Sequence, residues 1–290
     1  MKSVLFSGVN TLNLFSYFKH RIQRKHGELI YFKRYKELIK IIKNESMQTY
    51  FQPIVNIQNG DTFAFEALNR PLQCVLFDST DHFYEFVGQT NIVFPFEQFC
   101  RNLSLKRFTE RINSQNGQNF NLFINIHPHV LLDKNYHSGE TFKFIKELGI
   151  QPEQVVFELT ERSAVTDFNE FKRVLSHYRK QGYRIAIDDV GSGYNSLKTL
   201  IYLKPEFIKL DRSLIQNIDQ NEAGQSLVSL IHEFAEQSKT KIIAEGIERL
   251  EELNYLQSVG IQYAQGYALG RPNQEIKLGS IPNSKNIPVK

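Results

Sequence analysis

Short apolar runs alternate with longer amphipathic stretches along most of this chain. The first two runs are TYFQPIVN (residues 49–56) and FAFEALNR (63–70), and the turn signal Asn59-Gly60 lies between them. Six more follow: NLFINI (121–126), VVFELTE (155–161), RIAIDDV (184–190), FIKLD (207–211), KIIAEGIE (241–248) and YAQGYALG (263–270). Runs of this length, rich in β-branched residues, are typical of buried strands.

The stretches between the runs have helical periodicity. Helices are predicted at 34–45, 81–110, 139–148, 167–181, 195–203, 219–238 and 249–259. Strands that alternate with helices indicate an α/β fold with a mainly parallel sheet, and eight such runs favour a closed, TIM-like (β/α)8 barrel. The first two runs are close enough to pair as a hairpin, so we expect the first strand to run antiparallel to the second.

Three segments are expected: a basic N-terminal extension at 1–33, the barrel at 34–275 and a C-terminal tail at 276–290. Of the 290 residues, 41% are hydrophobic and 23 are Phe, enough for a sizeable core. Since no apolar stretch approaches the roughly 20 residues of a membrane span and no signal peptide is evident, we expect a cytoplasmic protein.

Charge is distributed unevenly around a net value of +4. Ten basic residues and three glutamates give residues 1–45 a charge of +7, which leaves −3 on the remainder. The barrel therefore lacks the basic surface of proteins that bind nucleic-acid polymers. For the N-terminal segment the first expectation is packing on the barrel; the alternative is weak contact of residues 1–45 with a membrane surface.

Polar residues follow the predicted strands at the point where each strand ends. The most prominent are the adjacent Asp188 and Asp189, which in isolation would more often cap a helix or open a turn. Ligand-type residues, however, stand at consecutive strand ends: Glu66 with Arg70, Asn125, Glu158 with Glu161, Asp188 with Asp189, Lys209 with Asp211, Glu245 with Glu248, and Gln265. In a parallel barrel these ends share one face, which is where active sites of this architecture lie.

Several carboxylates at one barrel mouth repel each other unless cations neutralise them. Oxygen ligands without His or Cys indicate Mg²⁺ or Mn²⁺, and a pair of such ions suits phosphoryl transfer. Lys209 would orient an attacking water or stabilise phosphoryl oxygens, and Arg70 suits phosphate binding. Simple ion pairs of Lys209 and Arg70 with the carboxylates are the alternative.

These residues resemble the EAL-domain cyclic di-GMP phosphodiesterases of bacteria. The resemblance covers about residues 35–273 and rests on seven ordered motifs: FQPIV…FEALNRP with Glu66-Ala67-Leu68, INI, FELTE, DDVGSGYNSL, IKLD, AEGIE and AQGYALGRP. It implies hydrolysis of cyclic di-GMP to linear 5′-pGpG with two metal ions, Mg²⁺ or Mn²⁺.

The resemblance also implies a role for individual residues. Metal ligands fall on Glu66, Asn125, Glu158, Asp188 and Asp189, with Glu245 at the second metal or as general base. Lys209 matches the lysine that contacts the nucleophilic water, and Gln265 a glutamine near that water, so Lys209, Glu245, Glu66 and Gln265 form the expected catalytic set. Positions that contact the dinucleotide in the family are matched by Gln52, Leu68 and Arg70. Substrate contacts are also expected from Asp211 and Glu248. Glu161 matches a residue that holds the loop after the fifth strand.

One motif departs from the family pattern. The family's Asp-Phe-Gly-Thr-Gly is here Asp189-Val190-Gly191-Ser192-Gly193, so an aromatic packing group is lost while a hydroxyl is kept. In the family, this loop is associated with dimerisation and with coupling of the dimer state to catalytic activity. A homodimer is therefore expected from the resemblance, and the change bears on regulation rather than chemistry.

The sequence is consistent with three functions. The first is an active cyclic di-GMP phosphodiesterase, because every ligand residue is present. The second is a non-catalytic receptor that binds cyclic di-GMP and signals through its N-terminal segment. The third is a barrel enzyme that acts on another phosphodiester, which explains the acidic cluster but not the full order of motifs.

Overall fold

The computed structural model describes residues 27–72, 75–112, 119–126, 139–160, 168–192 and 196–282. The chain divides into two compact units: Met1–Met47 with Pro71–Thr90, and Gln48–Arg70 with Asn91–Lys290. This division differs from the expected boundaries after residues 33 and 275, which stay predictions. Part of the expected C-terminal tail packs on the larger unit, since Ile276 is buried and the Gly279 N–H donates to Thr62 Oγ1 at 2.9 Å.

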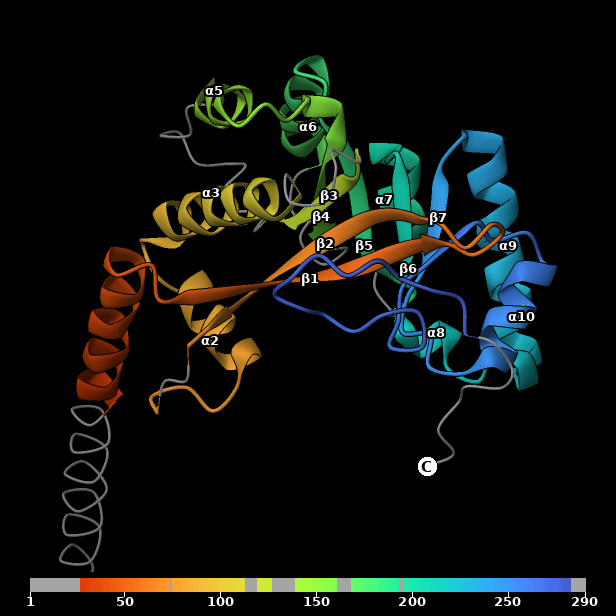
Figure 1. Cartoon of the computed structure of the whole chain (residues 1–290), viewed down its shortest axis with the longest axis horizontal. Coiled ribbons are helices and arrows are strands. Elements are labelled where there is room, and N and C mark those ends of the chain that lie inside the picture. Colours follow the sequence, from red (N-terminus) through yellow and green to blue (C-terminus); the bar gives the residue numbers. More distant parts are fainter. Residues whose placement is uncertain are drawn as a thin grey trace, which may run out of the picture. The chain divides into compact units, whose positions relative to one another are not determined.

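Eight strands of the larger unit close into a barrel in the order of the sequence, as predicted. They are β1 (Met47–Asn56), β2 (Thr62–Pro71), β3 (Asn121–Asn125), β4 (Val155–Thr160), β5 (Arg184–Val190), β6 (Phe207–Leu210), β7 (Lys241–Ala244) and β8 (Tyr263–Ala264). Helices lie around the outside of these strands (Figure 1): α3 (Val93–Ile112), α5 (Gly139–Glu147), α6 (Phe168–Lys180), α7 (Ser196–Leu203), α8 (Arg212–Ile215), α9 (Glu222–Ser238) and α10 (Leu250–Ser258).

Strand directions confirm the expected antiparallel first strand. β2 to β8 are parallel to their neighbours, whereas β1 pairs with β8 in antiparallel register, Val55 opposite Ala264. The turn between β1 and β2 depends on Gly60, whose φ of +85° is a conformation that glycine adopts without strain. Its N–H donates to the Asn56 carbonyl at 2.8 Å.

The eighth strand is shorter than the predicted 263–270. After Gln265 the chain turns, because the Leu269 and Gly270 N–H groups both bond to the Gly266 carbonyl. Gly266 itself lies so close to Ile247 that a Cβ atom would approach the Ile247 backbone nitrogen to 2.2 Å. A residue with a side chain would not fit there, and the periodicity of the sequence does not reveal this close approach.

One apolar layer fills the barrel interior with a single side chain from each strand. Its members are Ile54, Ala64, Phe123, Val156, Ala186, Phe207, Ile243 and Tyr263. Successive side chains of a strand point to opposite faces, so the residue two positions further along each strand points into the barrel again. This layer therefore forms the floor for the next interior layer.

The smaller unit contains a helix over residues 27–43 and helix α2 (Thr80–Gly88). Leu38 and Ile41 of the first helix are buried, and Tyr31 packs on Phe86 with ring centroids 5.2 Å apart. Arg34 Nε donates to the Leu76 carbonyl at 2.9 Å. The described helix begins before residue 34, where the sequence predicted its start, because Ile30 and Tyr31 extend its packed face.

No helix in the described ranges is long and apolar enough to cross a membrane. The segment 1–26, for which the sequence suggested packing on the barrel or membrane contact, lies outside the described residues.

Candidate active site

The interior layer above the apolar floor is polar on every strand. In β2 to β8 its members lie two residues after the floor residues, and in the antiparallel β1 two residues before. They are Gln52, Glu66, Asn125, Glu158, Asp188, Lys209, Glu245 and Gln265. All eight are residues that the sequence singled out, and the period of two that sets the floor also turns them inward.

Lys209 is the centre of this polar layer. Its Nζ lies 2.8 Å from Glu158 Oε1, 2.8 Å from Glu245 Oε1, 3.3 Å from Asp188 Oδ1 and 3.4 Å from Glu66 Oε2. The lysine side chain is only 1% exposed. One buried ammonium thus faces four carboxylates, which leaves an excess of negative charge.

Glu66 is held in position from two further strands. Asn125 Nδ2 donates to Glu66 Oε1 at 3.1 Å, and Gln265 Nε2 donates to Glu66 Oε2 at 2.8 Å. Both donors are neutral amides, so they orient the carboxylate without cancelling its charge. The three side chains come from β2, β3 and β8, which places Glu66 at the meeting point of distant parts of the chain.

A β-bulge brings the carboxylates of Asp188 and Asp189 to the same side of β5. The register with β6 shifts between Ile187 and Val190, and Asp189 has a φ of +59°. Regular pleating would point two adjacent side chains to opposite faces. Oxygen atoms of Asp188, Asp189 and Glu245 lie within 4.8 Å of one another, a spacing that would suit a shared cation.

Burial and the shared lysine govern protonation at the site. Burial, together with the charges of Glu66 and Asp188, raises the pKa of Glu158 well above its ordinary value despite Lys209. Burial likewise raises the pKa of Glu245. For Glu66, burial acts in the same direction, but Lys209, Gln265 and Asn125 outweigh it and lower the pKa. The four carboxylates outweigh the burial of Lys209, whose pKa is well above its ordinary value, so the lysine stays charged.

The raised pKa of Glu158 predicts how the metal-free protein responds to pH. A carboxyl group whose pKa is higher in the folded state destabilises the fold as pH rises from its unfolded pKa, about 4.3, through its folded pKa. In EDTA, the melting temperature of wild type should fall relative to that of Glu158→Gln, which mimics the protonated acid, as pH increases. Thermal unfolding at a series of pH values measures this gap.

The control for this experiment is Glu233→Gln on α9, an exposed carboxylate remote from the site. Its melting temperature should follow that of wild type at every pH. A constant difference between Glu158→Gln and wild type across the series would contradict the assignment of a raised pKa to Glu158.

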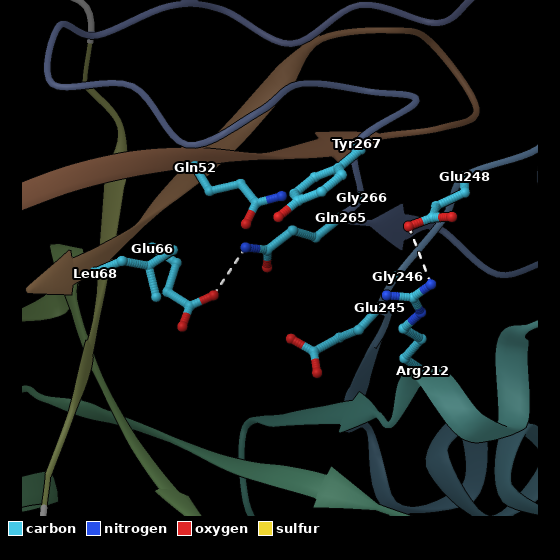
Figure 2. Close-up of a pocket in the computed structure, with 10 residues that line it drawn as sticks. All are labelled: Gln52, Glu66, Leu68, Arg212, Glu245, Gly246, Glu248, Gln265, Gly266 and Tyr267. Atoms are coloured by element: carbon cyan, nitrogen blue, oxygen red, sulfur yellow. Dashed lines mark hydrogen bonds and ion pairs between the residues drawn. The ribbon is translucent and has the colours of Figure 1, made fainter. Parts of the chain in front are cut away.

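A cavity of about 240 Å³ opens beside the polar layer. Glu66 and Glu245 face this space from β2 and from the end of β7, and Gln52 lies next to Gln265 (Figure 2). Further lining residues are Leu68, Arg212, Gly246, Glu248, Gly266 and Tyr267. Of the predicted substrate contacts, Gln52, Leu68 and Glu248 therefore border one cavity together with the central carboxylates.

Two other predicted substrate contacts are not among the residues that line this cavity. The guanidinium of Arg70 lies over the Tyr50 ring, 5.7 Å from its centroid. Asp211 caps α8, where its Oδ1 accepts from the Ser213 N–H at 2.9 Å, a role that was not expected from the sequence. Glu161, expected to hold the loop after the fifth strand, lies outside the described residues, as do residues 193–195 of that loop.

Arg212 and Tyr267 border the cavity but were not singled out from the sequence. Arg212 pairs with Glu248 at 3.1 Å, and Arg271 lies over the Tyr267 ring at 4.4 Å (Figure 2 shows the first pair). Arg212 directly follows the recognised IKLD motif, whereas Tyr267 lies within the recognised AQGYALGRP motif. Both lie one or two residues after a residue that was predicted to act at the site, Asp211 or Gln265.

The residues of the polar layer fit divalent cations. The second carboxylate oxygen of Glu158, Oε2, is buried, and no hydrogen-bond partner for it occurs among the described residues. A buried anionic oxygen without a donor is costly unless a cation satisfies it. All candidate ligands are oxygen atoms, the type that Mg²⁺, Mn²⁺ and Ca²⁺ prefer.

Comparison with known proteins agrees with the motifs. A family model described as the EAL domain matches residues 35–272. The probable cyclic di-GMP phosphodiesterase PdeA of Escherichia coli is 30% identical over 66% of this chain, and cyclic di-GMP phosphodiesterase RocR of Pseudomonas aeruginosa is 29% identical over 82%. The matches span 26% of PdeA and 60% of RocR, so the chain corresponds to only part of these relatives.

A solved structure with a similar fold contains both a metal and the dinucleotide. It is the manganese and cyclic di-GMP complex of Klebsiella pneumoniae BlrP1, with a TM-score of 0.72 and 28% identity, covering 81% of this chain and 58% of BlrP1.

Proposed function

Because this chain belongs to the EAL-domain family, we propose that it is a phosphodiesterase that opens cyclic di-GMP to linear 5′-pGpG. The observation that carries the proposal is Lys209 buried among Glu66, Glu158, Asp188 and Glu245 at the carboxyl ends of the strands. The curated relatives above are named cyclic di-GMP phosphodiesterases, some as probable ones.

Two Mg²⁺ or Mn²⁺ ions are part of this proposal. Their ligands would be Glu66, Asn125, Glu158, Asp188, Asp189 and Glu245. Support comes from the excess of carboxylates over Lys209, from the buried Glu158 Oε2, and from the proximity of Asp188, Asp189 and Glu245. When bound, such ions supply Lewis-acid chemistry that lowers the pKa of water and stabilises charge on a phosphoryl group.

The residues of the chain would position and deprotonate the attacking water. Lys209 holds a charge that favours developing negative charge on the phosphoryl oxygens, and Gln265 fixes Glu66 beside it. Glu245, partly open to the cavity with 19% of its side chain exposed, is placed to accept the water proton. The water oxygen forms a bond to phosphorus, the bond from phosphorus to the 3′ oxygen breaks, and the released 3′ oxygen takes up a proton.

The remaining proposed contacts concern the dinucleotide and the assembly. Gln52, Leu68 and Glu248 border the cavity, while contacts from Arg70 and Asp211 are proposed from the sequence alone. The homodimer rests on the resemblance. Val190, which replaces the family's aromatic residue, is buried and pairs with Leu210 of β6, so its side chain contributes to the barrel wall.

A substrate panel tests the proposed reaction against its alternatives. With Mn²⁺ present, the protein should convert cyclic di-GMP to pGpG much faster than it hydrolyses cyclic di-AMP or bis-p-nitrophenyl phosphate. Similar rates on all three would favour an enzyme for another phosphodiester. Tight binding of cyclic di-GMP without any product would favour the non-catalytic receptor.

A further inference from the structure

One face of the helix over residues 27–43 exposes apolar side chains. Leu29 is 50% exposed, Phe32 54% and Ile39 43%. These positions recur at intervals of three and seven residues, so they lie along one side of the helix. The buried Leu38 and Ile41 lie on the opposite side, where the helix packs within its own unit. The exposed apolar face is thus distinct from the face that stabilises the unit.

Four lysines lie on the same exposed face. They are Lys33, Lys36, Lys40 and Lys43, and all four are exposed. Lys36 Nζ lies over the Phe32 ring, 4.9 Å from its centroid. Glu37 is half-buried and pairs with Lys40 at 3.7 Å, and Glu28 is the one exposed carboxylate near this face in the described part of the helix. The apolar side chains are therefore surrounded by positive charge.

This combination favours a lipid surface over a second copy of the chain. In a parallel pair of these helices, residues 29, 32, 36, 39 and 43 would form the contact seam, and Lys36 and Lys43 would each meet the same lysine of the partner. Lysine at such positions destabilises a coiled coil. An anionic membrane surface instead attracts the lysines while the interface accepts Leu29, Phe32 and Ile39.

The distribution of charge along the chain also favours an anionic lipid surface. Residues 1–26 contain five basic residues and no acidic one, whereas residues 46–290 carry a net charge of −3. Electrostatic attraction to an anionic surface would therefore be concentrated at the N-terminal end. We propose that the exposed face of helix 27–43 binds anionic phospholipid surfaces.

The sequence offers a direct probe, because it contains no Trp. Phe32→Trp places a single indole on the proposed face, and its fluorescence should shift to the blue when vesicles of phosphatidylcholine and phosphatidylglycerol are added. Vesicles of phosphatidylcholine alone should cause a far smaller shift, and high salt should reverse it. The matched control is Tyr202→Trp on α7, an aromatic residue with a comparable exposed fraction of 47%, whose fluorescence should not change.

Charge variants complete the test with the full-length chain. Changing Lys33, Lys36, Lys40 and Lys43 together to Gln should weaken binding by about 600-fold, at about fivefold for each lysine. The same change at Lys143, Lys146, Lys172 and Lys180 on α5 and α6 removes equal charge and should have little effect. Hydrolysis of cyclic di-GMP without vesicles should be the same in both variants as in wild type.

Three results would overturn the proposal. One is unchanged emission of the Phe32→Trp protein on anionic vesicles. Another is an equal loss of binding in both sets of lysine variants, which would indicate general electrostatic attraction. The third is a blue shift that depends on protein concentration without vesicles, which would identify a second copy of the chain as the occupant of this face.

Discussion

Replacing Lys209 with Ala should lower turnover of cyclic di-GMP on the order of 10³-fold, the scale typical for loss of a central electrostatic or proton-transfer group. Lys209 is the cation that all four carboxylates of the polar layer contact. Without it, the polar layer loses the charge that favours developing negative charge on the phosphoryl oxygens. Steady-state rates with Mn²⁺, measured on protein whose folding is confirmed by circular dichroism, test this expectation.

A matched control comes from the neighbouring strand. Lys241 lies at the opposite end of β7, where its Nζ sits over the rings of Phe63 and Tyr263. Lys241→Ala removes the same charge from the same barrel without touching the carboxylates, so turnover should stay close to that of wild type. Turnover that is equally low in both variants, or undiminished in Lys209→Ala, would contradict the assigned role of Lys209.

Adding Mn²⁺ to protein stripped with EDTA should raise the melting temperature by several degrees. A ligand at a hundred times its dissociation constant stabilises the folded state by about 2.7 kcal/mol, and for a protein of this size each kcal/mol corresponds to roughly 2–4 °C. The physical cause is that the cations would neutralise carboxylates that otherwise repel each other across Asp188, Asp189 and Glu245. Thermal unfolding measures this effect without any reference to activity.

Variants of Asp188 and Asp189 should separate the repulsion between carboxylates from the stabilisation that Mn²⁺ provides. Asp188→Asn together with Asp189→Asn should leave the metal-free melting temperature equal to or above that of wild type, because repulsion is reduced. The same variant should lose most of the rise caused by Mn²⁺. Glu233→Gln on α9 is the control and should retain the full rise. A Mn²⁺ effect of equal size in all three proteins would place the ions elsewhere.

Much of the barrel could be predicted because its signals are local. Each apolar run is short, ends in polar residues and is separated from the next by a helical stretch, so the order and closure of the strands follow from general rules. The floor and polar layers obey the same period of two, and this is why the residues at strand ends gather around Lys209. The turn at Asn59-Gly60 likewise identified the antiparallel hairpin of β1 and β2.

What could not be predicted depends on contacts between distant residues. The bulge that turns Asp189 toward Asp188 requires the register of β5 against β6, which no local pattern contains. The end of β8 is set by the close approach of Gly266 to Ile247. The capping role of Asp211 depends on the short helix α8, which no predicted element covered. The exposed face of helix 27–43 carries apolar residues, and their sequence pattern alone does not distinguish this face from one buried in the core.

Hydrolysis of cyclic di-GMP by the purified protein with Mg²⁺, with Mn²⁺ or with EDTA, with the products resolved by chromatography, tests the proposed enzyme and its metal site together. The proposed site predicts that linear 5′-pGpG appears with Mg²⁺ or Mn²⁺ and that EDTA abolishes it. Absence of pGpG with either ion, from a folded protein that still binds cyclic di-GMP, would contradict the proposed enzymatic function. Formation of pGpG that EDTA does not affect would contradict the metal site.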